Sequence, residues 1–205
     1  MISGKWDLLL RAVLTGGIAI VSIIGDHGLK YGRTALLRAL FDNFTHASVG
    51  GLTWALILRL SKQSLVQELS SIVLCFCLSS LVDVDHFLSA RSWKLDDATH
   101  LQKRPFLHCT TVPIVVWFLL ILSSNMFHYP KLGYYSWMIC ASFLSHHIRD
   151  GTRRGLWFYP LGSTKPIPYY LYICLCMALP YILHWCMIAS NSFRIQNNIL
   201  KVDIV

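Results

Sequence analysis

The chain has 205 residues, of which 55% are hydrophobic and only 14% are charged. Soluble domains usually carry about 25% charged residues, so this composition argues against a water-soluble fold and favours an integral protein of the lipid bilayer. The formal net charge of +8 then indicates basic loops that face anionic lipid. Because no basic stretch is interleaved with aromatic residues, we expect no nucleic-acid binding.

Long apolar segments predict an all-α fold, a multi-pass transmembrane helical bundle of about six spans that forms a single membrane domain over residues 1–205. In chain order, the predicted spans cover residues 8–25, 45–60, 65–82, 106–124, 133–148 and 169–189. The second and fifth are shorter than the ~20 residues of a full span. Small residues in the second span, such as Gly50 and Gly51, indicate close helix packing instead of lipid exposure.

Loop charge predicts how these spans are oriented. Lysine and arginine gather in the loops after the first, third and fifth spans, for example at Lys30, Arg91, Lys103 and Arg154. The positive-inside rule then places these odd-numbered loops in the cytoplasm and both termini in a lumen or outside the cell. The sequence does not identify the organelle.

Ionisable side chains lie at the ends of four predicted spans. His46 begins the second span, Asp83, Asp85 and His86 end the third, His108 begins the fourth, and His146 and Asp150 end the fifth. Because successive spans alternate in direction, all of these positions meet at one membrane face, which is the cytoplasmic one by loop charge. Imidazole and carboxylate groups are typical ligands of zinc, manganese or iron. The pattern therefore predicts a divalent-metal site that holds one metal, or two metals bridged by a carboxylate.

Helical spacing supports this site. His146 and Asp150 are four residues apart, and Asp83 and His86 are three apart, so each pair shares one side of a helix. Asp85 would point away unless the helix ends there. The structural alternatives are that the aspartates cap a following helix and that the histidines are interfacial.

Polar motifs follow one another in a fixed order along the chain. They are Thr45-His46 with Gly50, Asp83-Val84-Asp85-His86, Arg104-Pro105-Phe106-Leu107-His108, Ser145-His146 with Asp150, and Gly155-Leu156-Trp157 with Pro160. This ordered set resembles the bacterial inner-membrane metal-dependent hydrolases of the YdjM type over most of residues 42–162. A closer resemblance, over nearly the whole chain, is to the transmembrane protein 267 family of animals. The first resemblance implies a hydrolase, and the second implies a multi-pass membrane protein.

Three positions near the fourth span depart from the YdjM pattern. Lys103, Pro105 and Leu107 stand where the resemblance places a histidine, a glycine and a threonine. The first of these matters most, because a protonated lysine is a poor metal ligand. If that histidine is a ligand in relatives, two interpretations stay open. This chain holds one metal where relatives hold two, or it keeps the fold without the activity.

These observations lead to one main functional hypothesis, a metal-dependent membrane hydrolase or a descendant of one. The metal ligands would be His46, Asp83, Asp85, His86, His108, His146 and Asp150. Asp85 or Asp150 would act as general base. Arg104, Arg149 and Arg153 would bind an anionic lipid headgroup or another phosphoester.

The main alternative is a non-enzymatic membrane protein with a structural polar cluster. A transport role is disfavoured because the polar groups lie at one end of the spans and not near the bilayer midplane. A haem site is also disfavoured, because only His184 is deep within a predicted span.

Overall fold

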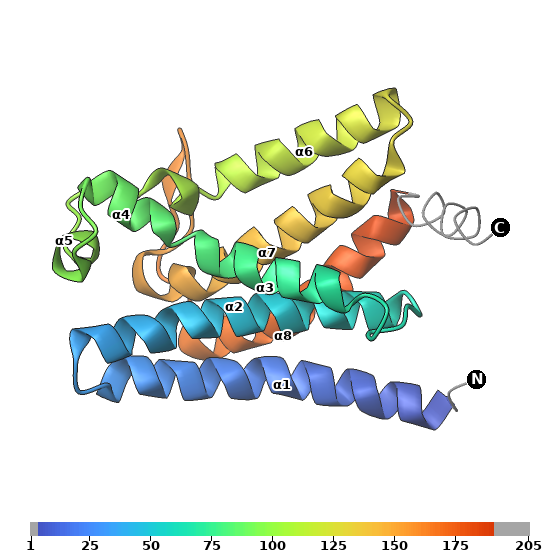
Figure 1. The fold of residues 1–205 in the computed structure, drawn as a ribbon, viewed down its shortest axis with the longest axis horizontal. Helices are drawn as coiled ribbons and strands as arrows, with labels where there is room; N and C mark the ends of the chain where they lie inside the picture. Colours follow the sequence, from blue (N-terminus) through green and yellow to red (C-terminus); the bar gives the residue numbers. More distant parts are fainter. Residues whose placement is uncertain (1–3, 191–205) are drawn as a thin grey trace.

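The computed structural model describes residues 4–190 and confirms the predicted all-α bundle (Figure 1). Its helices are α1 (Gly4–Tyr31), α2 (Ala35–Leu60), α3 (Leu69–Leu81), α4 (Val84–Ala90), α5 (Leu95–Thr99), the 3-10 helix η1 (Phe106–His108), α6 (Thr111–Met126), α7 (Pro130–Arg154) and α8 (Tyr169–Ala189). Within the described residues, strands are limited to a short antiparallel hairpin of β1 (Trp157–Phe158) and β2 (Gly162–Ser163). Three helical stretches are long and apolar enough to cross a membrane, namely α1, α3 continued by α4, and α8. Helix α6 is apolar but shorter.

The predicted and observed helices differ mainly at one end of the bundle. Helix α8 has the predicted bounds, whereas α2 begins at Ala35 instead of residue 45 and α7 continues to Arg154 instead of ending at residue 148. The added turns carry charged residues, so a hydropathy window stops before them. Thr34 caps the earlier start of α2, since its hydroxyl accepts a hydrogen bond from the backbone amide of Leu37.

Helices α2 and α7 form the centre of the bundle. Helix α2 contacts α1, α3, α7 and α8, and α6 packs on the outer side of α7 (Figure 1). Trp54 of α2 and Trp137 and Met138 of α7 are buried in the largest apolar cluster together with Leu183 of α8. Because surrounding helices shield α2 and α7, both can carry polar side chains that a lipid-facing helix would not tolerate.

The helix predicted over residues 65–82 begins later, at Leu69, and ends within one residue of its predicted end. Helix α3 ends at Leu81, a turn follows at Val82 and Asp83, and α4 restarts the chain in a helical path at Val84. Asn43 of α2 holds this turn, because its side-chain amide donates to the Ser80 carbonyl (3.0 Å) and to Asp83 Oδ2 (3.3 Å). The break changes the direction in which the following Asp85 points.

The contact between α2 and α3 depends on a glycine. A Cβ atom at Gly50 would lie 1.9 Å from Ser79 Oγ, whereas a Cβ atom at Gly16 of α1 would meet no atom within 4 Å. We expect Gly50→Ala to destabilise the protein by about 1–3 kcal/mol, because α3 must move away or Ser79 must leave its place. Thermal unfolding in detergent measures this, with Gly16→Ala as the control. Equal melting temperatures for the two variants would contradict the close packing.

Candidate metal centre

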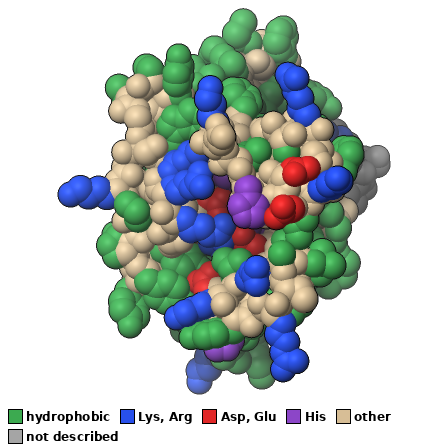
Figure 2. Space-filling model, turned by 90° about the vertical axis from the view of Figure 1, so that its left-hand side faces the viewer, with side chains coloured by type: hydrophobic (Ala, Val, Ile, Leu, Met, Phe, Trp, Pro, Cys, Tyr) green, Lys and Arg blue, Asp and Glu red, His purple; other side chains and the backbone are tan. Residues whose placement is uncertain are grey.

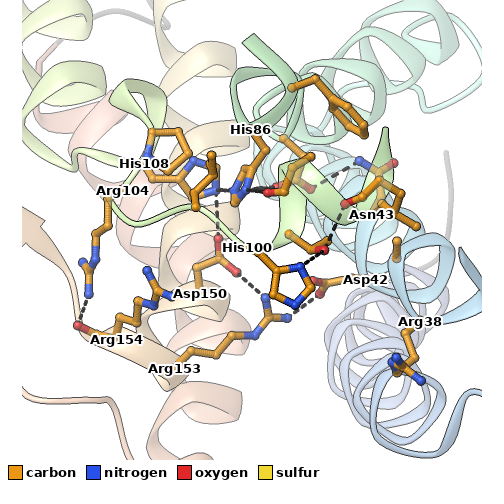
Figure 3. Close-up of a pocket in the computed structure, with 18 of the residues that line it drawn as sticks. Arg38, Asp42, Asn43, His86, His100, Arg104, His108, Asp150, Arg153 and Arg154 are labelled. Atoms are coloured by element: carbon orange, nitrogen blue, oxygen red, sulfur yellow. Dashed lines mark hydrogen bonds and ion pairs between the residues drawn. The ribbon is translucent and has the colours of Figure 1, made fainter. Parts of the chain in front are cut away.

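Ionisable side chains from four parts of the chain meet at one end of the bundle, the end at which α2 begins and α7 finishes. They come from α2, from the α3–α4 turn with the first turn of α4, from η1 and from α7. Figure 2 shows acidic, basic and histidine side chains gathered around a hollow in this end of the molecule. In Figure 3, the labelled side chains of His86, His108 and Asp150 point toward one another. The structure thus brings together residues that lie more than 100 positions apart, as His46 and Arg149 do.

Three histidines direct the same ring nitrogen toward one point. The Nε2 atom of His108 lies 3.3 Å from Nε2 of His86 and 3.3 Å from Nε2 of His146. His86 Nδ1 lies 3.2 Å from the Ala98 carbonyl, and His146 Nδ1 lies 2.9 Å from the Ser79 carbonyl. A carbonyl oxygen only accepts, so these Nδ1 atoms donate and leave the Nε2 lone pairs facing inward. Metal-binding histidines are oriented in the same way.

Two carboxylates complete this group of acceptors. Asp83 Oδ1 lies 3.5 Å from Nε2 of both His108 and His146. Asp150 Oδ2 lies 3.1 Å from His108 Nε2 and 3.3 Å from His146 Nε2. Asp150 Oδ1 is buried without a hydrogen bond. Such a concentration of acceptors is unfavourable unless a cation sits among them.

The carboxylates around His108 also favour a positive charge at this place. Burial alone would lower the pKa of His108, but the carboxylates of Asp150, Asp83 and Asp85 around its ring raise the pKa to about 11. The pocket therefore stabilises positive charge at the place where the three imidazoles meet.

The donor atoms fall into two overlapping sets. The first set is His46, Asp83, His146 and Asp150, and the second is Asp83, His86 and His108. Within each set, the possible ligand atoms all lie within 4.8 Å of one another. Asp83 belongs to both sets, so the arrangement has room for two metal positions that share this carboxylate. The donors suit zinc, manganese or iron.

Asp85 occupies a different place from the one predicted for it. It is 5% exposed, and its Oδ2 accepts a hydrogen bond from the Leu107 amide (2.6 Å) while its Oδ1 lies 3.2 Å from His108 Nδ1. Asp85 therefore lies behind His108, on the side away from the other Nε2 atoms. This placement corrects the expectation that it is a ligand or general base, because it orients a ligand instead. His147 holds the same segment, because its Nε2 donates a hydrogen bond to the Leu107 carbonyl (2.8 Å).

We expect Asp85→Asn to lower metal affinity by about 10–100-fold, because an amide holds the imidazole of His108 in place less firmly than a carboxylate does. The measurement is isothermal titration of zinc into metal-stripped protein. Asp97→Asn is the matched control, since Asp97 only accepts from Ser92 in the loop before α5. An Asp85→Asn affinity equal to that of the control would contradict the assigned role.

His46 lies at the edge of the cluster. Its ring stacks on that of His146, with 3.7 Å between centroids, and its Nε2 lies 3.4 Å from Asp150 Oδ1. The same Nε2 is 3.2 Å from Nη1 of Arg149. A nitrogen that accepts a hydrogen bond from arginine has no lone pair left for a metal. His46 would therefore have to give up its hydrogen bond from Arg149 before its Nε2 atom could bind a metal.

Arg149 was predicted to bind substrate, but the structure places it elsewhere. Its side chain is 1% exposed and pairs with Asp42 and, at 2.8 Å, with Asp26 of α1. Tyr172 of α8 donates to the other oxygen of Asp26 (2.9 Å). Arg149 therefore joins α1, α2 and α7 inside the bundle and does not line the pocket.

The sequence reasoning missed Asp26 and Asp42. Asp42 lies four residues before His46 on α2, and that spacing was a usable signal once the helix was extended toward Ala35. Nothing in the sequence marked Asp26, which lies in the last part of α1.

A pocket of about 800 Å³ opens over the cluster. Asp83, His86, His108 and Asp150 are among its lining residues. Its rim carries basic side chains, namely Arg38, Lys103, Arg104, Arg153 and Arg154 (Figure 3). Arg104 and Arg153 are thus at positions where an anionic group could reach them. Arg153 also contacts Asp42 (2.6 Å) and Asp150 (3.5 Å), which fixes it beside the donors.

The Gly-Leu-Trp segment after α7 holds the η1 segment in place. The Thr110 amide donates to the Trp157 carbonyl (2.7 Å), and Arg104 donates to the Gly155 and Arg154 carbonyls. Gly155 has a φ of +70°, and a Cβ atom there would lie 2.0 Å from the Thr164 carbonyl oxygen, so only glycine fits. The hairpin therefore sets the position of His108 relative to Asp150.

Comparison with known proteins shows what the chain as a whole is similar to. The family model of the YdjM inner membrane protein matches residues 41–202. Transmembrane protein 267 of Bos taurus is 39% identical over 190 residues, which is 89% of this chain and 85% of that protein. Transmembrane protein 267 of Mus musculus is 36% identical and covers 86% of this chain and 82% of that protein. The Xenopus laevis protein of the same name is 36% identical over 82% of this chain and 78% of its own length. No solved structure matches.

Proposed function

This chain belongs to the YdjM inner membrane protein family, and we propose that it is a metal-dependent hydrolase of phosphoesters at the membrane face. One observation carries the proposal. The Nε2 atoms of His86, His108 and His146 converge with the carboxylates of Asp83 and Asp150 at the inner end of a pocket with a basic rim. That combination pairs a metal-binding donor set with groups that bind a phosphate.

The donors would hold a divalent metal through His86, His108, His146, Asp83 and Asp150. Such a metal supplies a Lewis acid that stabilises the negative charge developing on a phosphoryl oxygen. Arg153 would bind another phosphoryl oxygen through its guanidinium group, whereas both terminal nitrogens of Arg104 already donate to the Gly155 and Arg154 carbonyls. In hydrolysis, water would add to phosphorus and give one proton to the base, the P–O bond would break, and the departing alkoxide would take up that proton to leave as the alcohol. Asp150 is the group that we assign to accept the proton from water, because its Oδ1 is buried without a hydrogen bond.

A second candidate is a non-enzymatic membrane protein in which the cluster is structural. The specific observation in its favour is the network of Arg149 with Asp26, Asp42 and His46, which joins three helices without any ligand. Lys103 in place of a histidine of the YdjM pattern fits the same candidate.

We also propose that the pocket faces the cytoplasm. The basic rim residues add to the other lysines and arginines in loops at this end of the bundle, and cytoplasmic loops are enriched in such residues. Helix α1 begins and α8 ends at the opposite end of the molecule (Figure 1). Both would then lie on the lumenal or extracellular side.

The test is hydrolysis of p-nitrophenyl phosphate by detergent-purified protein supplied with zinc, manganese or iron. We expect turnover that a chelator removes and that His108→Ala abolishes. His184→Ala is the matched control, because His184 lies at the other end of the bundle, where it contacts Ser61. Turnover that survives both the chelator and His108→Ala belongs to a contaminant and would reject the hydrolase. Metal binding without turnover of any phosphoester would favour the structural candidate.

A further inference from the structure

One wall of the pocket is apolar and leads out of the side of the bundle. Leu36 and Leu40 of α2 line the pocket, yet 61% and 57% of their surfaces are exposed. Phe87 of α4 and Leu95 of α5 line the same pocket on the side of the α4–α5 segment. The pocket is therefore flanked by apolar side chains of α2 and of the α4–α5 segment, and those of α2 are exposed at the surface of the bundle.

The apolar wall continues along α2 beyond the pocket. Leu36, Leu40 and Phe44 are spaced by four residues, so they form one stripe on the helix. Phe44 is 64% exposed and its ring packs edge-on against Phe76 of α3, with 5.8 Å between centroids. The stripe therefore runs from the pocket onto the outer surface of α2 and α3, which faces lipid in a membrane-spanning bundle.

Basic side chains line the same pocket. Arg38 is on α2 between the two leucines, Arg104 comes from the segment before η1, and Arg153 and Arg154 come from the end of α7 (Figure 3). A ligand that satisfies both walls must carry an anionic group and an apolar chain. A soluble phosphoester would leave the exposed leucine wall uncovered, whereas a phospholipid would cover it with an acyl chain.

We propose that the substrate is an anionic phospholipid that enters from the bilayer between α2 and the α4–α5 segment. Its phosphate lies at the basic rim next to Arg153, beside the metal-binding donors. Its acyl chains leave the pocket along the stripe of Leu36, Leu40 and Phe44 and remain in the membrane. This inference deepens the proposed hydrolase by naming its substrate class, and it rests on that function for catalysis but not for binding.

The test measures lipid binding and lipid hydrolysis separately. Full-length protein in phosphatidylcholine nanodiscs is mixed with dioleoyl phosphatidate, with water-soluble dibutyryl phosphatidate or with inorganic phosphate. Native mass spectrometry reports the bound ligand, and release of inorganic phosphate reports hydrolysis. The variant is Leu36→Asn combined with Leu40→Asn. The matched control is Leu37→Asn, because Leu37 is 39% exposed on the same helix but does not line the pocket.

We expect dioleoyl phosphatidate to bind more tightly than dibutyryl phosphatidate. The double variant should bind the long-chain lipid about tenfold more weakly or worse, because it loses apolar contacts. Its affinity for inorganic phosphate should be unchanged, and the Leu37→Asn control should bind the lipid as the wild type does. Equal binding of the two phosphatidates, or a double variant that binds as the wild type does, would overturn lateral entry. If inorganic phosphate binds and neither phosphatidate does, the pocket takes a soluble ligand, and this result would also overturn lateral entry. Long-chain binding that the double variant removes, without hydrolysis, would uphold the lipid site and reject the hydrolase.

Discussion

Replacing Arg149 by methionine should destabilise the protein by about 3 kcal/mol, because it removes a buried cation from two partly buried aspartates, of which only Asp42 keeps another cation, Arg153. Arg149 is 1% exposed, and its guanidinium pairs with Asp26 and Asp42 on two other helices. Methionine has a similar volume, so the loss comes from unpaired charge and not from a cavity. The measurement is the free energy of unfolding in detergent, followed by circular dichroism.

Arg153→Met is the matched control for this prediction. Arg153 contacts the same Asp42, but its side chain is 44% exposed, so solvent replaces much of the lost interaction. A triple variant, Arg149→Met with Asp26→Asn and Asp42→Asn, should recover part of the lost stability because it removes the unpaired charges. Equal unfolding free energies for Arg149→Met and Arg153→Met would contradict a buried charge network.

Replacing Asp83 by asparagine should remove metal binding from the whole cluster, with affinity lowered by about 100-fold or more. Asp83 is the residue that both donor sets share, and its Oδ1 faces His108 and His146 at equal distances of 3.5 Å. An asparagine keeps the shape and the bond from Asn43 but loses the negative charge. Titration of zinc into the metal-stripped variant checks this.

The His86→Ala variant distinguishes the loss of one metal position from the loss of both. His86 belongs to one donor set only, so its loss should remove one metal position and leave His46, Asp83, His146 and Asp150 in place. Wild-type protein that binds two equivalents, with one in His86→Ala and none in Asp83→Asn, would establish a shared carboxylate. Two equivalents in Asp83→Asn would show that the carboxylate does not bridge the positions.

The meeting of the polar groups could be predicted from the order of the spans alone. His46, Asp83, His108 and Asp150 were placed at one face because each lies at the same end of alternating helices, and that argument needs no distances. The i,i+4 pair of His146 and Asp150 also has the predicted relation, with 3.3 Å between Nε2 and Oδ2. Hydrophobic periodicity was sufficient here because the lipid-facing helices are strongly apolar.

The charged extensions of α2 and α7 could not be predicted in the same way. Their arginine and aspartate side chains pair with one another across helices, and a hydropathy window scores each charge as if it stood alone. The roles of Asp85 and Arg149 were misassigned for the same reason. Asp85 turns behind His108 because the helix breaks at Asp83, and Arg149 points inward because Asp26 arrives from α1. Both depend on tertiary contacts that single-residue preferences do not contain.

The most direct test of a metal centre is the metal content of detergent-purified protein, measured by inductively coupled plasma mass spectrometry. Wild type is compared with the double variant His108→Ala and Asp150→Ala, purified in parallel without added metal or chelator. The donor geometry predicts zinc, manganese or iron at one or two equivalents in the wild type and none in the variant. A folded wild-type protein that carries no metal, and binds none when metal is added, would contradict the metal centre and leave the cluster with a structural role.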